Sequence, residues 1–383
     1  MTVAGVSDAA VLRTPLYETH LAHGGRMVPF AGYDLPIQYE AGVLQEHLHT
    51  RRAAGLFDVS HMGQIELRPR SGDVADAAAA LERLVPADIV ALAGNRQRYS
   101  VFTNEEGGIL DDLMIANLGD RLYLVVNAAC KAADLNHLRA HLAYSCEIVA
   151  RFDRGLMALQ GPLAAAALAP HAPEAPGMAF MECREMTVAG IPCTVSRSGY
   201  TGEDGYEIGM AAEHADAIAS ALLTSPDVAL IGLGARDSLR LEAGLCLYGA
   251  DLDTGTTPVE AALEWSIQKS RRPGGSRTGG YPGAERIAQE LADGPRRRRI
   301  GLRPEGKAPV RGGAMLHASA EDGPQIGIVT SGGFGPTAAA PVGMGYVDVV
   351  NMPADELVYA ERRGARLPVR IAPMPFVEKS YKR

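Results

Sequence analysis

Two adjacent carboxylates, Asp111 and Asp112, are the first candidates for chemistry in this sequence. They follow a pair of glycines inside an otherwise apolar, strand-forming run, GGILDDLMI at residues 107–115. Because successive side chains of a strand point to opposite faces, the two carboxylates cannot form one dyad, and at least one is expected to be covered. Either that group is functional, or one aspartate caps the glycine turn while the other sits in an ion pair. No histidine or second acidic pair lies nearby at ligand spacing, which makes a metal site the weaker interpretation.

A glycine-rich loop, SGYTGEDGYE at residues 198–207, brings four more polar side chains together. Its glycines at 199, 202 and 205 match neither the dinucleotide-binding GxGxxG spacing nor a Walker loop, so phosphate binding is not supported. Glu203 and Asp204 favour a solvated hairpin loop. Tyr200 and Glu207 are the better candidates for a functional role.

A third run, IGLGARDSLRLEAG at residues 231–244, predicts a strand that ends in glycines and a helix that begins near Arg236. Helix N-termini favour anions, so Arg236 could hold a carboxylate or a carbonyl group. Arg236 and Arg240 could equally be structural partners of Asp237 and Glu242. The histidines at 47, 49 and 61 lack the spacing of a zinc site or a catalytic triad, and the arginines at 296–299 are most simply a solvated strand entry.

The elements that position these residues occur in the same order twice. Strand and helix patterns cover residues 62–150 and recur over residues 155–231, and each half gives approximately the β-α-β-β-α-β order of a ferredoxin-like unit. Tyr123 precedes a pair of alanines at 128–129, as Tyr206 precedes a pair at 211–212. We therefore expect a duplicated α+β body, although mixed proteins also give such strings by chance.

After the second half the sequence changes character. Residues 271–283 are rich in arginine, glycine and proline and are expected to form a loop, followed by a short helix at residues 284–291. Beyond residue 294 we predict five short strands, at residues 299–302, 325–330, 342–347, 356–359 and 367–371. Short β runs separated by glycine and proline are typical of a small antiparallel barrel or sandwich.

Composition narrows the classes of function. Lys and Arg number 37 against 45 Asp and Glu, and the net charge of −8 disfavours a broad nucleic-acid-binding surface. The five cysteines are an odd number without a CxxC pair, so we expect neither a disulfide framework nor a cysteine zinc site. Residues 1–17 resemble neither a secretory signal nor a transit peptide, and no stretch approaches the length of a membrane span. These features predict a cytoplasmic protein without a membrane or nucleic-acid partner.

Several motifs, taken together, resemble one known family. They are TPLY (14–17), HLAHGGRM (20–27), FDVSHM (57–62), GGILDDL (107–113), GYTGEDGYE (199–207), GLGARD (232–237) and IVTSGGFGPT (328–337). In this order they resemble the aminomethyltransferase family, the T-proteins of the glycine cleavage system. The resemblance runs from about residue 14 to residue 381, and the whole set of motifs is highly specific.

The resemblance implies a fold and a reaction. The implied fold is a three-domain cloverleaf around a central tetrahydrofolate channel, with a duplicated ferredoxin-like body and a C-terminal antiparallel β-barrel. The implied reaction moves an aminomethyl group from the dihydrolipoyl arm of H-protein to tetrahydrofolate. Its products are 5,10-methylenetetrahydrofolate, ammonia and reduced lipoyl H-protein. Tetrahydrofolate is then an acceptor substrate, no metal, flavin or nicotinamide is involved, and the P- and L-proteins are functional partners.

The motif match also implies roles for single residues. Asp112, the second carboxylate of the pair, is expected to be the catalytic residue. The expected folate-lining residues are Met62, Tyr99, Asn127, Tyr200, Glu207, Arg236 and Tyr381. We expect residues 1–290 to form the folate-binding region, in which about 1–55 and 155–290 make one lobe and 56–154 the second. Residues 291–383 are expected to form the β-barrel domain.

Relatives with the same architecture leave other functions open. The chain lacks the N-terminal GxGxxG flavin domain of sarcosine and dimethylglycine dehydrogenases, and it lacks the KGCYxGQ signature of folate-binding iron–sulfur assembly factors. The enzymatic alternative is a dimethylsulfoniopropionate demethylase, which transfers a methyl group to the same acceptor. The non-enzymatic alternative is a folate-binding assembly factor.

Overall fold

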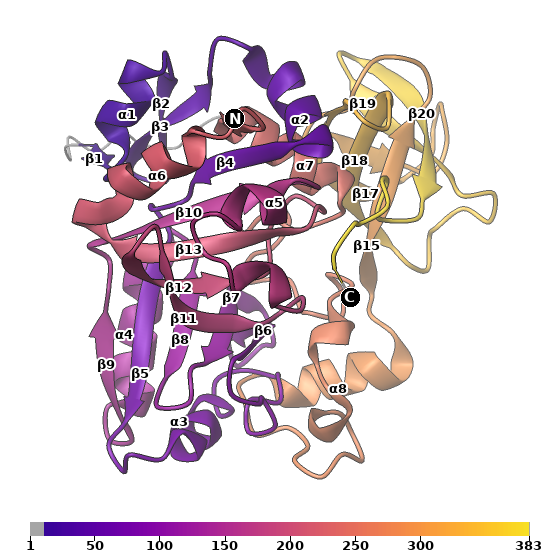
Figure 1. Ribbon diagram of the computed structural model, residues 1–383. Coiled ribbons are helices and arrows are strands. Elements are labelled where there is room, and N and C mark those ends of the chain that lie inside the picture. Colours follow the sequence, from indigo (N-terminus) through magenta and orange to yellow (C-terminus); the bar gives the residue numbers. More distant parts are fainter. Residues whose placement is uncertain (1–10, 383) are drawn as a thin grey trace.

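The N-terminal arm supplies a small sheet, two helices and one strand that belongs elsewhere in the fold (Figure 1). The computed structural model describes residues 11–382. Strands β1 (Leu12–Arg13), β2 (Arg26–Phe30) and β3 (Tyr33–Gln38) form a sheet in the order β1-β3-β2, beside helices α1 (Tyr17–Ala22) and α2 (Gly42–Arg52). The next strand, β4 (Ala54–Asp58), leaves this sheet and pairs with β10 and β14 of the second repeated unit described below.

The first repeated unit is a five-stranded antiparallel sheet with two helices. Its elements are β5 (Gly63–Pro69), α3 (Val74–Leu81), β6 (Arg96–Thr103), β7 (Ile109–Asn117), β8 (Leu122–Val126), α4 (Lys131–Leu142) and β9 (Cys146–Ala150). The strand order is β6-β7-β8-β5-β9. Leu67 of β5, Leu81 of α3 and Leu138 of α4 are buried in one apolar cluster. Full burial of each such side chain contributes about 1.5–3 kcal/mol to folding.

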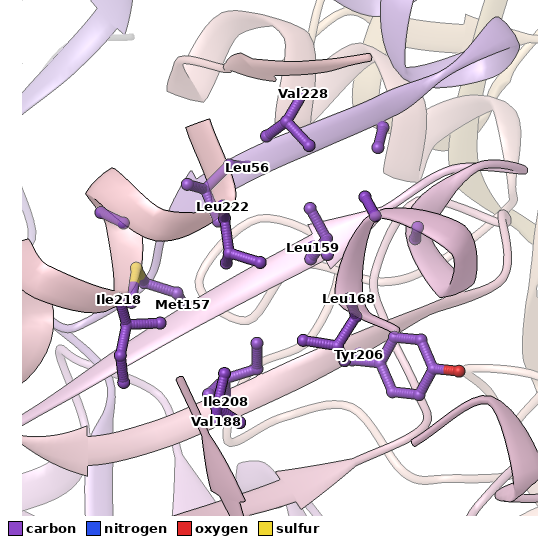
Figure 2. Packing of buried hydrophobic residues seen from close by; sticks show 14 of the residues in the cluster. Leu56, Met157, Leu159, Leu168, Val188, Tyr206, Ile208, Ile218, Leu222 and Val228 are labelled. Atoms are coloured by element: carbon purple, nitrogen blue, oxygen red, sulfur yellow. The ribbon is translucent and has the colours of Figure 1, made fainter. Parts of the chain in front are cut away.

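The second unit repeats this topology around a core of its own, which Figure 2 shows. Its elements are β10 (Arg154–Gln160), α5 (Ala164–Leu168), η1 (Ala175–Gly177), β11 (Cys183–Val188), β12 (Ile191–Ser196), β13 (Gly205–Ala211), η2 (Ala212–His214), α6 (Ala215–Leu223) and β14 (Val228–Leu230). Leu159 of β10 and Leu222 of α6 pack in the same buried cluster as Leu56 of β4. Strand β4 is therefore part of this core and lies between β10 and β14, in the order β11-β12-β13-β10-β4-β14.

The repeat predicted from the sequence is present, with one more strand in each unit than the ferredoxin-like order has. Three strands, not two, connect the two helices: β6, β7 and β8 in the first unit, and β11, β12 and β13 in the second. The added strand lies at the edge of the first sheet, and all four neighbouring pairs of that sheet are antiparallel. A duplicated α+β body is confirmed by this shared order.

The last part of the chain builds a helix at the domain junction and a closed barrel (Figure 1). Helix α7 (Leu233–Glu242) follows β14, and η3 (Glu264–Ser266), η4 (Lys269–Arg271) and α8 (Ala284–Asp293) lead to the barrel. The barrel strands are β15 (Arg297–Pro304), β16 (Met315–His317), β17 (Gln325–Gly335), β18 (Ala340–Asp348), β19 (Leu357–Arg362) and β20 (Ala365–Ala372). They close in the order β15-β18-β17-β16-β19-β20, so the predicted barrel or sandwich is a barrel.

Arginines tie the junction segments to the units. The loop at residues 271–283 is irregular, as predicted, but Arg277 pairs with Glu82 at 3.2 Å and also with Asp88 of the first unit. The prediction of a solvated entry to β15 is wrong. Arg299 is buried and donates to the Ala261 carbonyl oxygen at 2.8 Å.

Within residues 11–382, no helix is long and apolar enough to cross a membrane.

Candidate active site

Asp111 and Asp112 lie on β7 just beyond the point where β8 stops pairing with it. The last β7–β8 pair joins Leu113 to Val126, and the next residue after β8 is Asn127. The Asn127 side-chain nitrogen donates to Asp111 Oδ1 at 2.9 Å and to Asp112 Oδ1 at 2.8 Å. One amide therefore holds both carboxyl groups, although strand alternation predicts that they diverge.

A bulge in the strand lies just before the two aspartates. In the β6–β7 pairing, Phe102 faces Asp111 and Thr103 faces Ile109, which leaves Leu110 as the extra residue of a bulge. Such a bulge bends the strand and re-aims the side chains next to it. Neither part of the structural alternative for the aspartates holds, because the glycine turn is closed by Asn104 Oδ1, which accepts from Gly108 at 2.8 Å. Within residues 11–382, no cation is among the main groups that shift the pKa of either aspartate.

The environment of Asp112 is apolar and negatively charged. Burial, followed by the charge of Asp111, raises the pKa of the Asp112 carboxyl group to about 7. Hydrogen bonds from Asn127 and from the Tyr99 hydroxyl group oppose this shift by stabilising the carboxylate. The ring of Tyr99 stacks on Trp265, with ring centroids 5.2 Å apart, and Trp265 is 59% exposed. A carboxyl group that changes its charge near neutral pH thus lies one side chain away from a surface indole.

A second cluster contains Tyr200, Glu207 and Arg236. The Arg236 guanidinium carbon lies 4.7 Å from the centre of the Tyr200 ring, and the Tyr200 hydroxyl group donates to the Cys246 carbonyl oxygen. Ser198 Oγ donates to Glu207 Oε2 at 3.1 Å. Burial raises the pKa of Glu207 and lowers that of Arg236, which means that both charges are poorly solvated. Within residues 11–382, the buried Nη1 of Arg236 has no hydrogen-bond partner.

The charge of the first cluster acts on a side chain of the second. The two remaining predicted residues, Met62 and Tyr381, lie in different places relative to these clusters. The charge of Asp112 contributes to raising the pKa of Tyr200, so both clusters border the same interior region. Met62 is half-buried against the apolar cluster that contains Ala235 of α7, next to Arg236. Tyr381 lies apart from both clusters. Its ring stacks on Phe180 at a centroid distance of 4.4 Å.

Ion pairs fix the loop at residues 198–207, which is not the solvated hairpin that its acidic residues predict. Arg51 Nη1 donates to Glu203 Oε1 at 2.8 Å, and Arg197 Nε donates to Asp204 Oδ1 at 2.9 Å. Gly199 has no room for a side chain, since a Cβ there would lie 1.7 Å from Gln160 Oε1. The loop therefore presents its polar groups in a fixed arrangement.

The arginines of α7 divide into one structural residue and one with a free donor. Arg240 donates to Asp237 at 2.8 Å and to Asp251 at 2.6 Å. Glu242 is paired with Arg51 at 3.0 Å and lies 3.1 Å from His47. The structural alternative thus holds for Arg240 and not for Arg236.

Comparison with known proteins places the chain in a family. The family model described as the GCVT N-terminal domain matches residues 16–271, and the glycine cleavage T-protein C-terminal barrel domain matches residues 297–378. The chain belongs to the glycine cleavage T-protein family. It is thereby an enzyme of the aminomethyltransferase type, a folate-dependent one-carbon transferase.

Relatives of this family match the chain over almost its whole length. The aminomethyltransferase of Mus musculus is 44% identical and that of Pisum sativum 43%, covering 96% and 98% of this chain and 91% of each relative. The crystal structure of glycine cleavage system aminomethyltransferase T from Bartonella henselae matches with a TM-score of 0.89 and 42% identity, over 97% of this chain and 100% of that one. Because the two relatives are named as mitochondrial, the expected cytoplasmic location is not confirmed and stays a prediction.

Several residues beside the two clusters were not predicted from their chemistry in the sequence. His61 is buried, and burial together with the charge of Arg236 lowers its pKa to about 4, which makes it a neutral imidazole beside the second cluster. The FDVSHM motif was the available signal for it. Trp265 and Asp134 carried no signal, because their contacts are to residues distant in the sequence. Within residues 11–382, no group of three His, Cys, Asp or Glu side chains is suited to hold a metal ion.

Proposed function

We propose that the protein transfers an aminomethyl group from the dihydrolipoyl arm of H-protein to tetrahydrofolate, with Asp112 as the catalytic residue. The products would be 5,10-methylenetetrahydrofolate, ammonia and reduced lipoyl H-protein, and the P- and L-proteins would be functional partners. Membership of the T-protein family supports the reaction. The observation that carries the assignment of Asp112 is its half-buried carboxyl group, held by Asn127 and Tyr99, with a pKa raised to about 7.

The residues of the second cluster fit a pterin. A pterin is a flat aromatic ring with adjacent N–H donors and a ring carbonyl group, and it needs apolar faces and a few convergent polar groups. Glu207 offers a carboxylate that accepts only one hydrogen bond at 3.1 Å, and Arg236 Nη1 is a buried donor without a partner among residues 11–382. Tyr200 and Met62 offer apolar surface beside them.

The chemistry divides between the acceptor and the chain. Tetrahydrofolate supplies the two nitrogen atoms that take up the one-carbon group. Asp112 holds or accepts a proton near neutral pH and stabilises positive charge that develops beside it. Asn127 and Tyr99 orient its carboxyl group through their hydrogen bonds, and Glu207 and Arg236 orient the acceptor.

The peripheral residues and the domain division belong to the same proposal. Tyr381 would line the outer part of the folate site from the C-terminal tail, where Ser380 N donates to the Gly202 carbonyl oxygen at 2.9 Å. We infer one folate-binding region at residues 1–290 and a barrel domain at residues 291–383. The pairing of β4 with β10 and β14 supports grouping the N-terminal arm with residues 155–290.

The test is turnover of aminomethylated H-protein with tetrahydrofolate by the wild type and by Asp112→Asn. The amide nearly preserves the shape and removes the charge, so we expect a loss of about 10²–10⁴-fold in kcat. Asp120→Asn, at an exposed turn of the same unit, is the matched control. Wild-type turnover by Asp112→Asn would overturn the assignment. Turnover of dimethylsulfoniopropionate instead of H-protein would indicate the demethylase, and folate binding without any turnover would indicate an assembly factor.

A further inference from the structure

A buried pair of carboxyl groups lies directly behind the proposed catalytic residue. Asp111 of β7 is 0% exposed and Asp134, in the first turn of α4, is 3% exposed. Their side chains are hydrogen-bonded to each other, and the thiol of Cys130 donates to the same Asp111 carboxyl group. Within residues 11–382, the groups that act on the two carboxyl groups include no cation.

Two carboxyl groups in this arrangement share one proton. Both cannot be ionised, because two buried negative charges in contact repel each other without compensation. The backbone N–H of Asn127 donates to Asp111 Oδ2 at 3.0 Å and its side-chain nitrogen to Oδ1 at 2.9 Å. Asp111 is therefore surrounded by donors and keeps the negative charge. Asp134 keeps the proton, and burial together with Asp111 raises its pKa to about 9.

What the pair holds in place is the amide of Asn127. The same side-chain nitrogen that donates to Asp111 also donates to Asp112 Oδ1 at 2.8 Å and to the Asp112 carbonyl oxygen at 3.0 Å. If Asp111 were protonated, one of its oxygens would carry an O–H, and the neutral carboxyl group would be a weaker acceptor for the two N–H donors of Asn127. The orientation of the Asp112 carboxyl group thus depends on the charge of Asp111.

We propose that Asp134 is a positioning residue of the reaction: by donating its proton to Asp111 it keeps Asp111 an anion, which fixes Asn127 and, through Asn127, the Asp112 carboxyl group. The inference rests on the proposed role of Asp112. Backbone hydrogen bonds at the start of α4 hold Asp134 close to Asn127. The backbone N–H of Asp134 donates to the Cys130 carbonyl oxygen at 2.9 Å, and that of Cys130 donates to the Asn127 carbonyl oxygen at 3.0 Å.

The same arrangement sets the pH response of Asp112. Titratable groups face it from every element packed around it: Tyr99 on β6, Asp111 on β7, Cys130 and Asp134 at α4, Tyr200 in the second unit, and Cys246 after α7. Of these, Asp111 contributes the largest charge effect. Loss of the Asp134 donor leaves Asp111 without its proton partner, so Asp111 becomes protonated and the pKa of Asp112 falls.

Two variants test whether Asp134 acts as a hydrogen-bond donor or only fills space. Asp134→Asn keeps an N–H that can donate to Asp111, whereas Asp134→Leu fills similar space without a donor. With H-protein substrate and tetrahydrofolate, we expect Asp134→Leu to lower kcat about 10- to 100-fold with a smaller change in KM. Its activity should persist to lower pH than that of the wild type. Asp134→Asn should stay within about threefold of the wild type and lose the fall in activity near pH 9.

The control and an independent readout keep the test decisive. Asp76→Asn alters an exposed first-turn aspartate of α3 and should change neither kcat nor the pH profile. Infrared difference spectra at neutral pH should show one protonated carboxyl group in the wild type that Asp134→Asn lacks. In Asp134→Leu the band should remain at a shifted frequency, because the proton then lies on Asp111, and this result does not depend on turnover. An unchanged pH profile in Asp134→Leu, equal defects in both Asp134 variants, or no such carboxyl band would each overturn the inference. Absence of wild-type turnover together with the band would contradict the proposed function alone.

Discussion

In the first repeated unit, the main groups within residues 11–382 that act on the buried carboxyl groups of Asp111 and Asp134 include no cation, and we infer that the two groups share a proton. In the second unit, the acidic residues of the loop before β13 each face an arginine, with Glu203 paired to Arg51 and Asp204 to Arg197. The two units share the order of their elements along the chain, and they differ in what compensates a buried negative charge. Burial and Asp111 place the pKa of Asp112 near neutral pH in the first unit, whereas arginines hold Glu203 and Asp204 of the second unit in their charged form.

The strongest way to sharpen this comparison is to remove one carboxylate from each unit. Asp112→Asn should lower kcat about 10²–10⁴-fold, because a group that handles a proton is lost. Glu207→Gln should raise the KM for tetrahydrofolate about tenfold and change kcat by less than about threefold, since only a charge-assisted hydrogen bond to the acceptor is weakened. Steady-state kinetics with saturating H-protein substrate measure both values. The division of roles fails if Glu207→Gln loses as much kcat as Asp112→Asn.

Breaking the arginine network should cost the most stability. Arg51 is 9% exposed as a side chain and pairs with Glu203 at 2.8 Å and with Glu242 at 3.0 Å. Arg51→Met leaves the covered carboxylate of Glu203 without its arginine and removes one of the two partners of Glu242, Arg51 and His47, so the free energy of unfolding should fall by about 3–5 kcal/mol. Arg68→Met in the first unit is the control, because Arg68 is 45% exposed and its loss should cost about 1 kcal/mol or less. If urea titrations gave equal losses of unfolding free energy for Arg51→Met and Arg68→Met, the arginine network would not be the stronger contributor to stability.

The two kinds of compensation should respond to pH with opposite signs. Hydrogen bonds and the charges of His47 and Arg51 lower the pKa of Glu242 from 4.5 to about 2, so its stabilisation is present above about pH 4.5 and is lost as the pH falls toward 2. Asp134 changes from 3.8 to about 9, so the folded state holds an extra proton and loses stability as the pH rises through that window. The expected slope is at most about 1.4 kcal/mol per pH unit.

Measurements of the free energy of unfolding at about pH 5, 7 and 9 check the sign of this pH dependence. Asp134→Asn should remove the alkaline decline, because its amide has no proton to lose. Glu242→Gln should leave that decline unchanged and remove the loss below about pH 4.5 instead. A wild-type protein whose stability does not fall between about pH 5 and 9 would show that Asp134 is not protonated in the folded state.

The smallest effect is expected at the C-terminal tail. Tyr381 stacks on Phe180 and lies apart from both clusters, so Tyr381→Phe should change the KM for tetrahydrofolate by less than about threefold. Tyr200→Phe, which loses the hydrogen bond to the Cys246 carbonyl oxygen, should have a larger effect in the same assay. A larger effect of Tyr381→Phe than of Tyr200→Phe would indicate that the tetrahydrofolate-binding surface lies closer to the C-terminal tail.

Sequence patterns predicted the fold well where local periodicity decides it. The five predicted barrel strands overlap β15, β17, β18, β19 and β20, and only the three-residue β16 was missed. The site was less accessible. Strand alternation separated Asp111 from Asp112, whereas the amide of Asn127, which follows β8, donates to both carboxyl groups. The partner of Glu203 lies 152 residues away, and no local pattern can supply it. Asn127 came from the family resemblance alone.

The position of β4 has a consequence for the order in which the chain can fold during synthesis. The first unit is complete once residue 150 has left the ribosome, and all its strand pairs join neighbours within its own 88 or so residues. Strand β4 is made earlier but pairs with Arg154–Gln160 and Val228–Leu230. Until residue 230 appears, it carries an open hydrogen-bonding edge and the uncovered side chain of Leu56. A nascent chain of about 200 residues is thus the species most exposed to misassociation, and the one for which a chaperone would matter most.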